Sequence, residues 1–368
     1  MKKILYVGGF ELPDKNAAAH RVMTNAKLFR EMGFDVLFVG ISKDIENAPS
    51  TVDGFSSTPV KYPTSIRNWY YQITTFMESR EIVALNPDYV VMYNFPAIAS
   101  LKILKVCHQH GIKVIHDLTE WESTEGWSVK DVIRKLDINL RMRYCMKRMD
   151  GVIAISRYLY EYYRRKTNTI LVPPMVDLSA KKWNRDRRLS CSENIRFVYA
   201  GSAGCGQKDR LDIIVKAIVT HVNTKLDVIG MTKEQYTSIY GILPNGADNI
   251  IFHGRVSHME AVKAVQDSDF QLLIRNGSRK NNAGFPTKFV ESMSCSIPII
   301  ATMTSNITDY LKDGVNGFVV SDEMPLDIVL EKVMHLTHNE IISMKEACRS
   351  LNCFDYRNYK SEFAKLFV

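Results

Sequence analysis

Residues 284–320, GFPTKFVESMSCSIPIIATMTSNITDYLKDGVNGFVV, combine a tight loop, a helix and a buried strand in one short stretch. Four residues form the loop: Gly284, Phe285, Pro286 and Thr287. Glycine frees the backbone and proline suits a first helical turn, so we expect a helix to open here. The apolar run at 297–301 is typical of a buried parallel strand. The stretch therefore predicts one helix–strand unit of a parallel α/β sheet.

The start of this helix carries the chemistry of a ligand site. Its free backbone N–H groups would attract an anion, and Lys288 adds a positive charge in the first turn. Glu291 follows about one turn later. We interpret the pair as a site for an anionic, hydroxyl-bearing ligand, with Lys288 on phosphate and Glu291 on ribose hydroxyls. An ordinary surface Lys–Glu pair remains the alternative.

The whole chain alternates strands with helices, which is the pattern of parallel α/β domains. We expect strands at 3–7, 35–39, 89–93, 113–116, 151–155, 196–199, 225–229, 250–252, 270–274, 297–301 and 317–319. Helices are expected at 17–32, 211–219 and 259–265. Pro173 and Pro174 mark a boundary. The prediction is a first Rossmann-like domain at 1–172, a second at 173–350, and a terminal helix at 351–368 that packs on the first domain or caps the second.

Composition supports two buried cores in a reducing compartment. The chain has 368 residues, too many for one ordinary domain, and 46% of them are apolar. Its seven cysteines form no CxxC pair and no regular spacing, which indicates free thiols and not a disulfide framework or a zinc site. No stretch approaches the length that would span a bilayer.

The net charge of +8 is concentrated in residues 134–188. This basic block holds fifteen Lys or Arg and five Asp or Glu, an excess of 15 − 5 = +10, so the rest of the chain carries 8 − 10 = −2. A helix from this block, with the tyrosines at 158–163 nearby, would suit an anionic membrane surface. A solvated basic face is the alternative. No nucleic-acid-binding motif is present, so nucleic acid is not expected as a partner.

The stretch at 284–320 resembles the nucleotide-sugar signature of retaining GT-B glycosyltransferases of the glycosyltransferase family 4-like type. The resemblance extends to the turn containing Asp309, Gly314, Asn316 and Gly317, and more diffusely to nearly the whole chain. It implies two Rossmann-like parallel-sheet domains that face one another across a cleft. It also implies a nucleotide-sugar donor, with the diphosphate at the helix start and the ribose on Glu291.

Other motifs gain expected roles from the same resemblance. In the second domain, Gly201, Ser202 and Lys208 match a diphosphate-binding glycine turn, and Arg210 or Arg275 would replace an arginine that the family often has at Ser202. Gly254 and Arg255 match a turn that receives the base. The first domain supplies a glycine loop and a loop facing the cleft, which contain Gly8, Gly9, His116, Asp117 and Glu120. His116 would contact the donor sugar, and the two carboxylates would orient His116 or bind the acceptor.

One family position departs from the pattern. The first of two family glutamates, which normally contacts the transferred sugar, is Ala283 here. The absence of this glutamate keeps two alternatives open: a UDP-sugar epimerase of the same fold, and a non-catalytic nucleotide-sugar-binding subunit.

The prediction is a retaining, metal-independent glycosyltransferase that needs no cofactor and serves bacterial surface polysaccharide synthesis. The donor would be a UDP-sugar or a GDP-sugar, and the acceptor a lipid-linked or other saccharide. Lys208, Lys288 and His116 are the expected catalytic residues. The Asp267–Ser268–Asp269 run imitates a metal-binding motif, but we expect Asp269 to end the preceding helix or to shape the turn. The expected location is the cytoplasm, peripheral on the inner face of the cell membrane.

Overall fold

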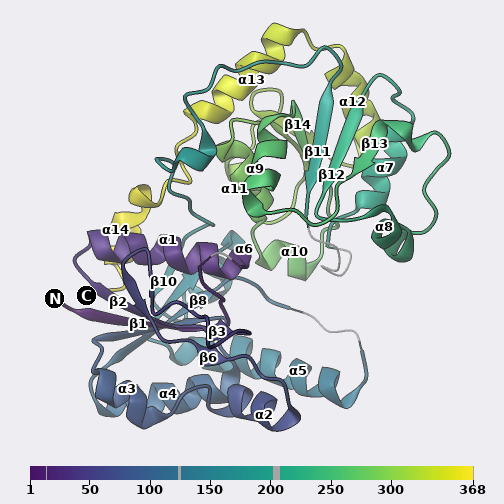
Figure 1. The fold of residues 1–368 in the computed structure, drawn as a ribbon. Coiled ribbons are helices and arrows are strands. Elements are labelled where there is room, and N and C mark those ends of the chain that lie inside the picture. The colour runs from purple at the N-terminus through teal and green to yellow at the C-terminus, as the bar shows by residue number, and fades with distance from the viewer. Residues whose placement is uncertain (14, 123–125, 202–207, 368) are drawn as a thin grey trace. The chain divides into compact units, whose positions relative to one another are not determined.

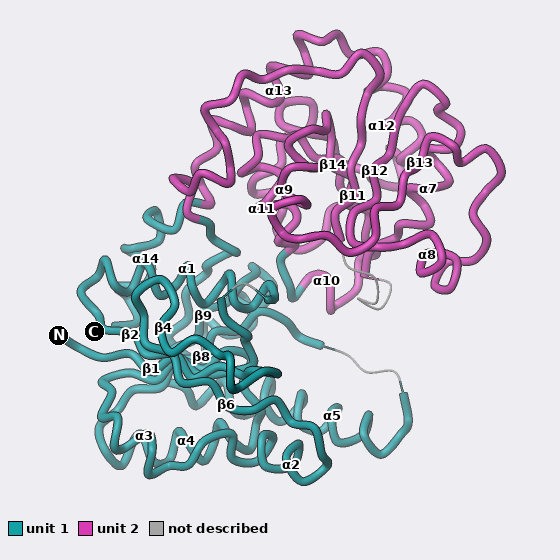
Figure 2. Tube along the Cα trace, in the orientation of Figure 1, with its two compact units in different colours: residues 1–176, 283–285, 355–368 teal, residues 177–282, 286–354 magenta. Residues whose placement is uncertain are grey.

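The computed structural model describes residues 1–13, 15–122, 126–201 and 208–367, and the chain forms two compact units (Figure 2). Unit 1 comprises Met1–Val176, Ala283–Phe285 and Asp355–Val368. Unit 2 comprises Asp177–Asn282 and Pro286–Phe354. Each unit has its own sheet and its own apolar core.

The main sheet of unit 1 has eight strands in the order β10-β9-β8-β7-β1-β2-β5-β4. Their bounds are β1 Lys3–Gly8, β2 Asp35–Val39, β4 Thr51–Val52, β5 Phe55–Ser57, β7 Tyr89–Tyr93, β8 Lys113–Leu118, β9 Gly151–Ala154 and β10 Thr169–Leu171. Every pair is parallel except β4 with β5. A separate two-stranded sheet joins β3 (Ile41–Ser42) and β6 (Val60–Lys61).

Helices cover both faces of this sheet (Figure 1). On one face lie α1 (Ala17–Glu31) and α14 (Lys360–Ala364), whose apolar side chains share a core with β1 and β2. The other helices are α2 Ile66–Thr74, α3 Ser79–Leu85, α4 Ala97–Gln109, α5 Val129–Leu140 and α6 Arg157–Tyr163. Helix α4 contacts α2, α3 and α5, so these four form one layer. A π-helical turn at Arg141–Cys145 and a 3₁₀ turn at Met146–Arg148 continue α5.

The sheet of unit 2 has six parallel strands in the order β13-β12-β11-β14-β15-β16. Their bounds are β11 Arg196–Ala200, β12 Lys225–Ile229, β13 Ile250–Phe252, β14 Phe270–Leu273, β15 Ile299–Thr302 and β16 Gly317–Val320. This is the doubly wound order, in which successive strands are added toward one edge of the sheet up to the third strand and toward the other edge from the fourth strand on. The reversal lies between β11 and β14.

Seven α-helices accompany this sheet within the described residues 208–350. They are α7 Leu211–Val219, α8 Lys233–Tyr240, α9 His258–Gln266, α10 Arg279–Ala283, α11 Thr287–Ser294, α12 Leu326–Met334 and α13 His338–Ser350. Helices α7 and α12 contact one another and bury the apolar core of one sheet face. Helices α9 and α11 pack together against the sheet strands. Short 3₁₀ turns occur at Lys181–Trp183, Ala247–Asn249, Ile307–Asp309 and Tyr356–Tyr359.

The fold confirms the predicted α/β class with parallel sheets. Strands β2, β7, β12 and β13 have the predicted bounds, and α7 does as well. β15 begins at Ile299, two residues later than predicted. Pro298 lacks an N–H for the ladder, although its carbonyl accepts from the Gln271 N–H at 3.0 Å. Ile297 and Pro298 therefore lead into the strand.

Candidate functional site

The candidate site in unit 2 lies where strands β11 and β14 end. These two neighbours are the point at which the strand order reverses, and ligands of open α/β sheets bind beyond the carboxyl ends at such a point. Gly201 directly follows β11, and Arg275 lies two residues beyond β14. An isolated bridge between Asp209 and Arg275 ties the two connections together.

Asp209 is the centre of a buried polar cluster at this point. Its Oδ1 accepts from the Arg275 Nε at 2.6 Å, and its Oδ2 accepts from the Tyr199 hydroxyl at 2.9 Å. Lys288, from the first turn of α11, forms a close ion pair with the same carboxylate. The Lys288 Nζ also lies 3.1 Å from the Tyr199 hydroxyl and 4.3 Å from the centre of its ring. Two cations from different connections thus converge on one carboxylate.

The electrostatics of the cluster fix its charge state. Burial alone would raise the pKa of Asp209, but Lys288 and Arg275 outweigh it and hold that pKa well below its usual range. The pKa of Tyr199 is raised well above its ordinary value by burial and then by Asp209. At neutral pH the cluster therefore contains one carboxylate, a neutral phenol and two cations, with an excess of one positive charge.

Gly201 leaves the room that Lys288 occupies. A Cβ added at Gly201 would lie 2.1 Å from the Lys288 Nζ and 2.7 Å from the Tyr199 hydroxyl. Any side chain here would force the Lys288 ammonium to move. Gly201, the first residue of the predicted glycine turn, and the predicted Lys288 are therefore neighbours in the structure.

Helix α11 begins as the sequence predicted, with its first residue at Thr287. Its N-cap is Pro286, which makes no side-chain cap. The N-cap residue therefore contributes no side chain that would neutralise the partial positive charge at the start of the helix. Glu291, one turn into α11, has its Oε1 3.3 Å from the His258 Nε2 at the start of α9. Sequence reasoning did not identify His258 as a neighbour of Glu291.

Lys208, Gly254 and Arg255 are further predicted residues of unit 2. The Lys208 backbone carbonyl accepts from the Asn281 Nδ2 at 3.2 Å. Gly254 has a φ of +66°, and its carbonyl accepts from the Gly230 N–H at 2.7 Å. Arg255 is exposed. Ser202 lies outside the described residues.

The two candidate arginines have different partners. Arg210 pairs with Asp212 two residues later, with its Nη2 2.6 Å from the Asp212 Oδ2. Arg275 is the one that joins the cluster around Asp209. Arg275 therefore stands in the structure where a second cation would be needed beside Lys288.

In unit 1 the strand order reverses between β1 and β7, and Gly8 ends β1 at that point. A Cβ added at Gly8 would lie 2.6 Å from the Tyr93 carbonyl oxygen, whereas one at Gly9 would meet nothing within 4 Å. Gly8 therefore allows the two strands to end close together, and Gly9 does not serve that purpose.

His116 and Asp117 are consecutive in β8, so their side chains point to opposite faces of the sheet. The His116 Nε2 accepts from the Phe95 N–H at 3.1 Å, and the imidazole is fully buried. Burial, aided by Arg141, lowers the pKa of His116 to about 3, so the ring is neutral at physiological pH. Its predicted contact with a donor sugar stays a prediction.

Asp117 is also fully buried, and its oxygens are already occupied. Arg21 donates to Asp117 Oδ1 from Nη2 at 2.7 Å, and the Tyr6 hydroxyl donates to Oδ2 at 2.5 Å. Asn25 donates to the same Oδ2 at 3.2 Å. An acceptor hydroxyl at Asp117 would have to compete with these donors. Glu120 lies just beyond β8 and is half-buried.

The loop before α11 is divided between the units. Gly284 and Phe285 belong to unit 1 with Ala283, and Phe285 is buried. Ala283, which occupies the position of the missing glutamate, is fully buried, and its carbonyl accepts from the Ser156 Oγ at 2.8 Å.

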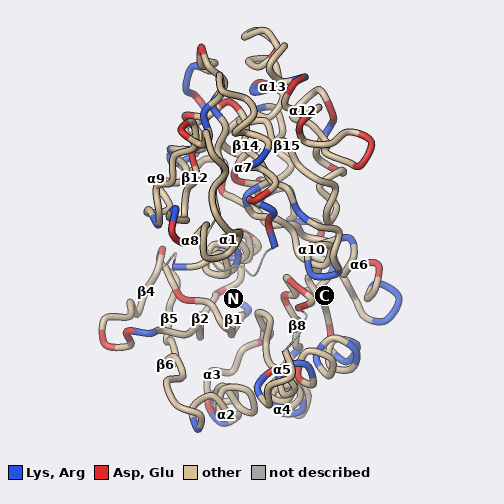
Figure 3. Tube along the Cα trace, turned by 90° about the vertical axis from the view of Figure 1, so that its right-hand side faces the viewer, with Lys and Arg blue, Asp and Glu red and all other residues tan. Residues whose placement is uncertain are grey.

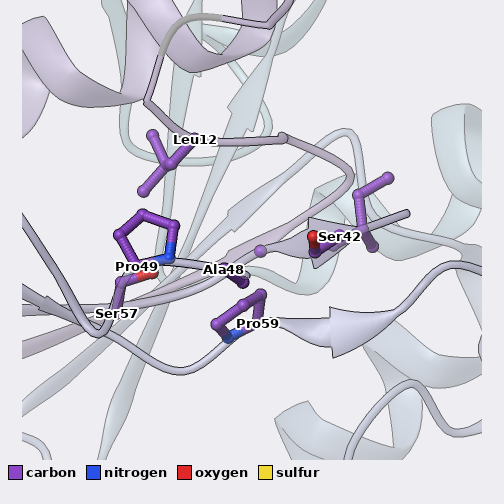
Figure 4. Close-up of a pocket in the computed structure, with 8 residues that line it drawn as sticks. Leu12, Ser42, Ala48, Pro49, Ser57 and Pro59 are labelled. Atoms are coloured by element: carbon purple, nitrogen blue, oxygen red, sulfur yellow. The ribbon is translucent and has the colours of Figure 1, made fainter. Parts of the chain in front are cut away.

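A small cavity in unit 1 and a larger pocket in unit 2 are lined by described residues. One lies in unit 1 between Leu12, Ser42, Pro49 and Pro59, and its volume of about 10 Å³ is enough for one water molecule (Figure 4). The other, of about 490 Å³, lies in unit 2 beside α9 and is lined by Asp227, His253 and Met259 among others. His253 belongs to the turn that was predicted to receive a base.

Asp209, Tyr199 and the already described His258 are site residues that sequence reasoning missed. Asp209 directly follows the predicted Lys208, which was the one available signal. Asp269 has a different role: it is buried and accepts from the Lys345 Nζ at 2.8 Å and the Arg196 N–H at 3.0 Å. It therefore anchors α13 to the sheet, and Asp267 is the C-cap of α9.

No group of three or more His, Cys, Asp or Glu side chains in the described parts of the chain could hold a metal ion. No helix among the described residues combines the length and the apolarity needed to cross a bilayer. The expectation of a metal-independent site remains a prediction.

Solved structures of similar fold cover the whole chain. Sucrose-phosphate synthase from Thermosynechococcus elongatus matches with a TM-score of 0.74 at 13% identity, over 100% of this chain and 98% of that one. HepE of Anabaena, solved in complex with UDP and glucose, matches with a TM-score of 0.66 at 14% identity, over 100% and 99%. The lipopolysaccharide outer core galactosyltransferase WaaB matches with a TM-score of 0.65 at 16% identity, over 99% of each chain. The chain has the GT-B fold.

Sequence comparison finds a family match within the second half of the chain. Residues 194–339 match the family model of glycosyl transferases group 1. An uncharacterised glycosyltransferase of Methanocaldococcus jannaschii is 29% identical over 130 residues, which is 35% of this chain and 35% of that protein. The aligned region thus spans about a third of this relative's length. Together with the fold, these matches support a GT-B glycosyltransferase.

Proposed function

We propose that this protein transfers a sugar from a nucleotide-sugar donor, of the UDP-sugar class, to a lipid-linked or saccharide acceptor in bacterial surface polysaccharide synthesis. The observation that carries the proposal is the convergence of Lys288 and Arg275 at the strand reversal of unit 2, beside the uncapped start of α11. Such a site suits a diphosphate. The complex of HepE with UDP and glucose gives further support, because that protein shares the fold.

The proposed reaction is a transfer with retained configuration. The bond between the sugar's anomeric carbon and the diphosphate breaks, and its electron pair goes to the diphosphate. The acceptor oxygen bonds to the same face of that carbon, and its proton goes to the departing diphosphate. Lys288, Arg275, Lys208 and the helix start would stabilise the charge that develops on the leaving group. Glu291 would bind the ribose hydroxyls.

Donor binding is the first test. We would measure thermal stability of the full chain with UDP, GDP, ADP and their sugar conjugates. A ligand at a hundredfold excess over its Kd adds about 2.7 kcal/mol of stability to a native state that alone binds it. We expect stabilisation by UDP and its conjugates, and a loss of affinity of about tenfold or more in Glu291→Gln and in Lys288→Met.

The matched control is Glu331→Gln, an exposed carboxylate on α12, which should leave nucleotide binding unchanged. Stabilisation that persists in both site variants would place the nucleotide elsewhere. No stabilisation by any nucleotide would contradict the proposal. Transfer itself is tested with radiolabelled UDP-sugar and lipid extracts, with retention read from the anomeric configuration of the product.

One observation favours a second candidate, a non-catalytic nucleotide-sugar-binding subunit. Alanine stands at the position of the missing glutamate, so this position supplies no carboxylate. Ala283 is buried, and its carbonyl accepts from the Ser156 hydroxyl. Nucleotide binding without turnover in the presence of lipid extract would support this candidate over the transferase.

A further inference from the structure

Helix α5 in unit 1 exposes its apolar stripe. Val129, Val132, Ile133, Leu136 and Leu140 recur at the spacing of one helix face, and all five are exposed. Leu136 is 66% exposed and Ile133 is 50% exposed. Ile138 is the one residue of α5 that is buried. An amphipathic helix normally turns such a stripe toward the core, so this face awaits a partner.

Helix α2 repeats the arrangement. Ile66, Trp69 and Tyr70 recur on one face and are exposed, Ile66 to 92%. Thr74 is the one residue of α2 that is buried. Tyr71 is exposed as well. Large apolar and aromatic side chains are therefore presented outward by a second helix of the same layer.

The two helices contribute to one surface. The Lys130 Nζ of α5 lies 5.6 Å from the centre of the Trp69 ring of α2. Just before α5, Trp127 is 87% exposed, and the Lys135 Nζ lies 4.5 Å from its ring centre. Both helices also contact α4, on the same side of the sheet (Figure 1). We call this combined surface, made by α2, Trp127 and α5, the α2–α5 face.

The charge of this face is positive. Helices α2 and α5 contain four Lys or Arg and two Asp, a net charge of 4 − 2 = +2, and the exposed cations Arg143, Lys147 and Arg148 follow in the turns after α5. Figure 3 shows blue Lys and Arg positions along α5. The two acidic side chains are engaged locally: Asp137 Oδ1 accepts from the Ala97 N–H at 2.8 Å, and Asp131 accepts from the Ser128 hydroxyl at 2.6 Å.

We propose that the α2–α5 face docks on an anionic lipid bilayer. The apolar stripes would enter the headgroup and acyl boundary, and the lysines would lie over anionic headgroups. Exposed Trp and Tyr side chains favour that boundary because one end of each ring is polar. This inference deepens the proposed function at its lipid-linked acceptor, and its tests use no nucleotide, so the two can fail separately.

The α2–α5 face differs in part from the membrane surface that the sequence predicted at residues 134–188. Within the tyrosine run at 158–163, Tyr163 is fully buried, and its hydroxyl donates to the Met142 carbonyl at 2.5 Å, whereas Tyr158 is exposed. Met142 and Met146, from the basic block, are buried. The apolar residues of the α2–α5 face come from α5 and from α2, and α2 lies outside that block.

Flotation of the full chain with vesicles tests the proposal. We expect binding to phosphatidylglycerol–phosphatidylcholine vesicles, much weaker binding to phosphatidylcholine alone, and release by high salt. The double variant Ile133→Ser/Leu136→Ser should bind about tenfold more weakly, because it removes apolar area from the bilayer. Lys130→Gln/Lys135→Gln should also lose about tenfold, since each lysine near an anionic surface contributes several-fold.

Matched controls in unit 2 separate this face from general surface properties. Val222→Ser/Ile242→Ser replaces two exposed apolar residues, and Lys233→Gln an exposed lysine; both should bind vesicles like wild type. Trp fluorescence gives an independent readout: a blue shift with anionic vesicles should shrink in Trp127→Tyr. Circular dichroism melts confirm that each variant is folded.

Three results would overturn the proposal. The first is no binding to anionic vesicles. The second is equal binding by wild type and both α2–α5 variants. The third is a concentration-dependent dimer in sedimentation that Ile133→Ser/Leu136→Ser abolishes while vesicle binding is unchanged, because a second copy of the chain would then cover this face.

Discussion

His116 illustrates how burial decides the state of a single residue. Its imidazole lies inside unit 1, and its Nε2 accepts from a backbone N–H. Because the ring is neutral at physiological pH, it serves as a hydrogen-bond acceptor and adds no positive charge of its own. Any contribution to sugar binding would therefore come from a neutral imidazole.

The pKa of His116 predicts acid sensitivity. Because the pKa falls from 6.5 to about 3 on folding, the unfolded chain binds more protons between these values. The contribution of His116 to stability is full above pH 6.5 and is lost as the pH falls toward 3. In urea melts from pH 4 to 7.5, His116→Gln should reduce the slope of unfolding free energy by up to about 1.4 kcal/mol per pH unit.

The control for this experiment is His338→Gln, an exposed histidine at the start of α13. It should keep the wild-type slope. An unchanged slope in His116→Gln would show that the imidazole gains its proton in the folded protein at the same pH as in the unfolded chain, which contradicts the burial argument.

At the residue scale, the sequence singles out Lys288 but not the buried carboxylate of Asp209 beside it. Lys288 could be found because it follows a recognisable loop. Asp209 could not be given a role, because its partners Arg275 and Lys288 lie 66 and 79 residues away along the chain. Only the sheet order brings these connections together, and a single sequence carries no signal of that pairing.

At the scale of elements, the reversal of strand order creates a close approach in each unit. In unit 1 the end of β1 passes so near Tyr93 that the last residue must lack a side chain. In unit 2 the residue after β11 must leave space for an ammonium group. The two glycine loops thus have a packing reason that is independent of any ligand.

Gly8→Ala tests this packing reason. The new Cβ would lie 2.6 Å from a backbone oxygen, which cannot move away as a flexible side chain could. We expect a loss of about 2–3 kcal/mol of stability, measured by urea denaturation. Gly9→Ala is the matched control, because its Cβ would meet nothing, and a change within about 0.5 kcal/mol is expected. Equal effects of the two substitutions would contradict the packing explanation.

The sequence predicted the strands of the two main parallel sheets better than the two-residue strands. A buried parallel strand such as β7 is a continuous apolar run, so its bounds could be read directly. The two-residue strands β3 and β6 have no periodic signal and were not predicted. The amphipathic pattern of α5 is clear in the sequence, but its outward direction is not, because periodicity marks an apolar face without saying what covers it.

At the scale of the whole molecule, unit 1 is completed by the end of the chain. Residues Asp355–Val368 belong to it, although unit 2 intervenes in the sequence. The Tyr356 hydroxyl pairs with Glu31 of α1, and the Asn168 Nδ2 donates to the Lys365 carbonyl at 2.9 Å. The core of unit 1 therefore joins residues from both ends of the chain.

Phe363→Ala measures how much this connection stabilises unit 1. Phe363 of α14 is fully buried, and its ring centre lies 5.2 Å from that of Phe29 on α1. Its truncation should cost about 3–5 kcal/mol, because it loses buried apolar area and leaves a cavity. Calorimetry should show the transition of unit 1 at a lower temperature, whereas the exposed substitution Lys360→Ala in the same helix should leave it in place.

Since unit 2 has its own core, a nucleotide that binds unit 2 should raise the transition temperature of unit 2 in both variants. If Phe363→Ala left the unit 1 transition unchanged, the terminal helix would contribute no stability to unit 1, and its packing against α1 would not be part of that unit's folded core.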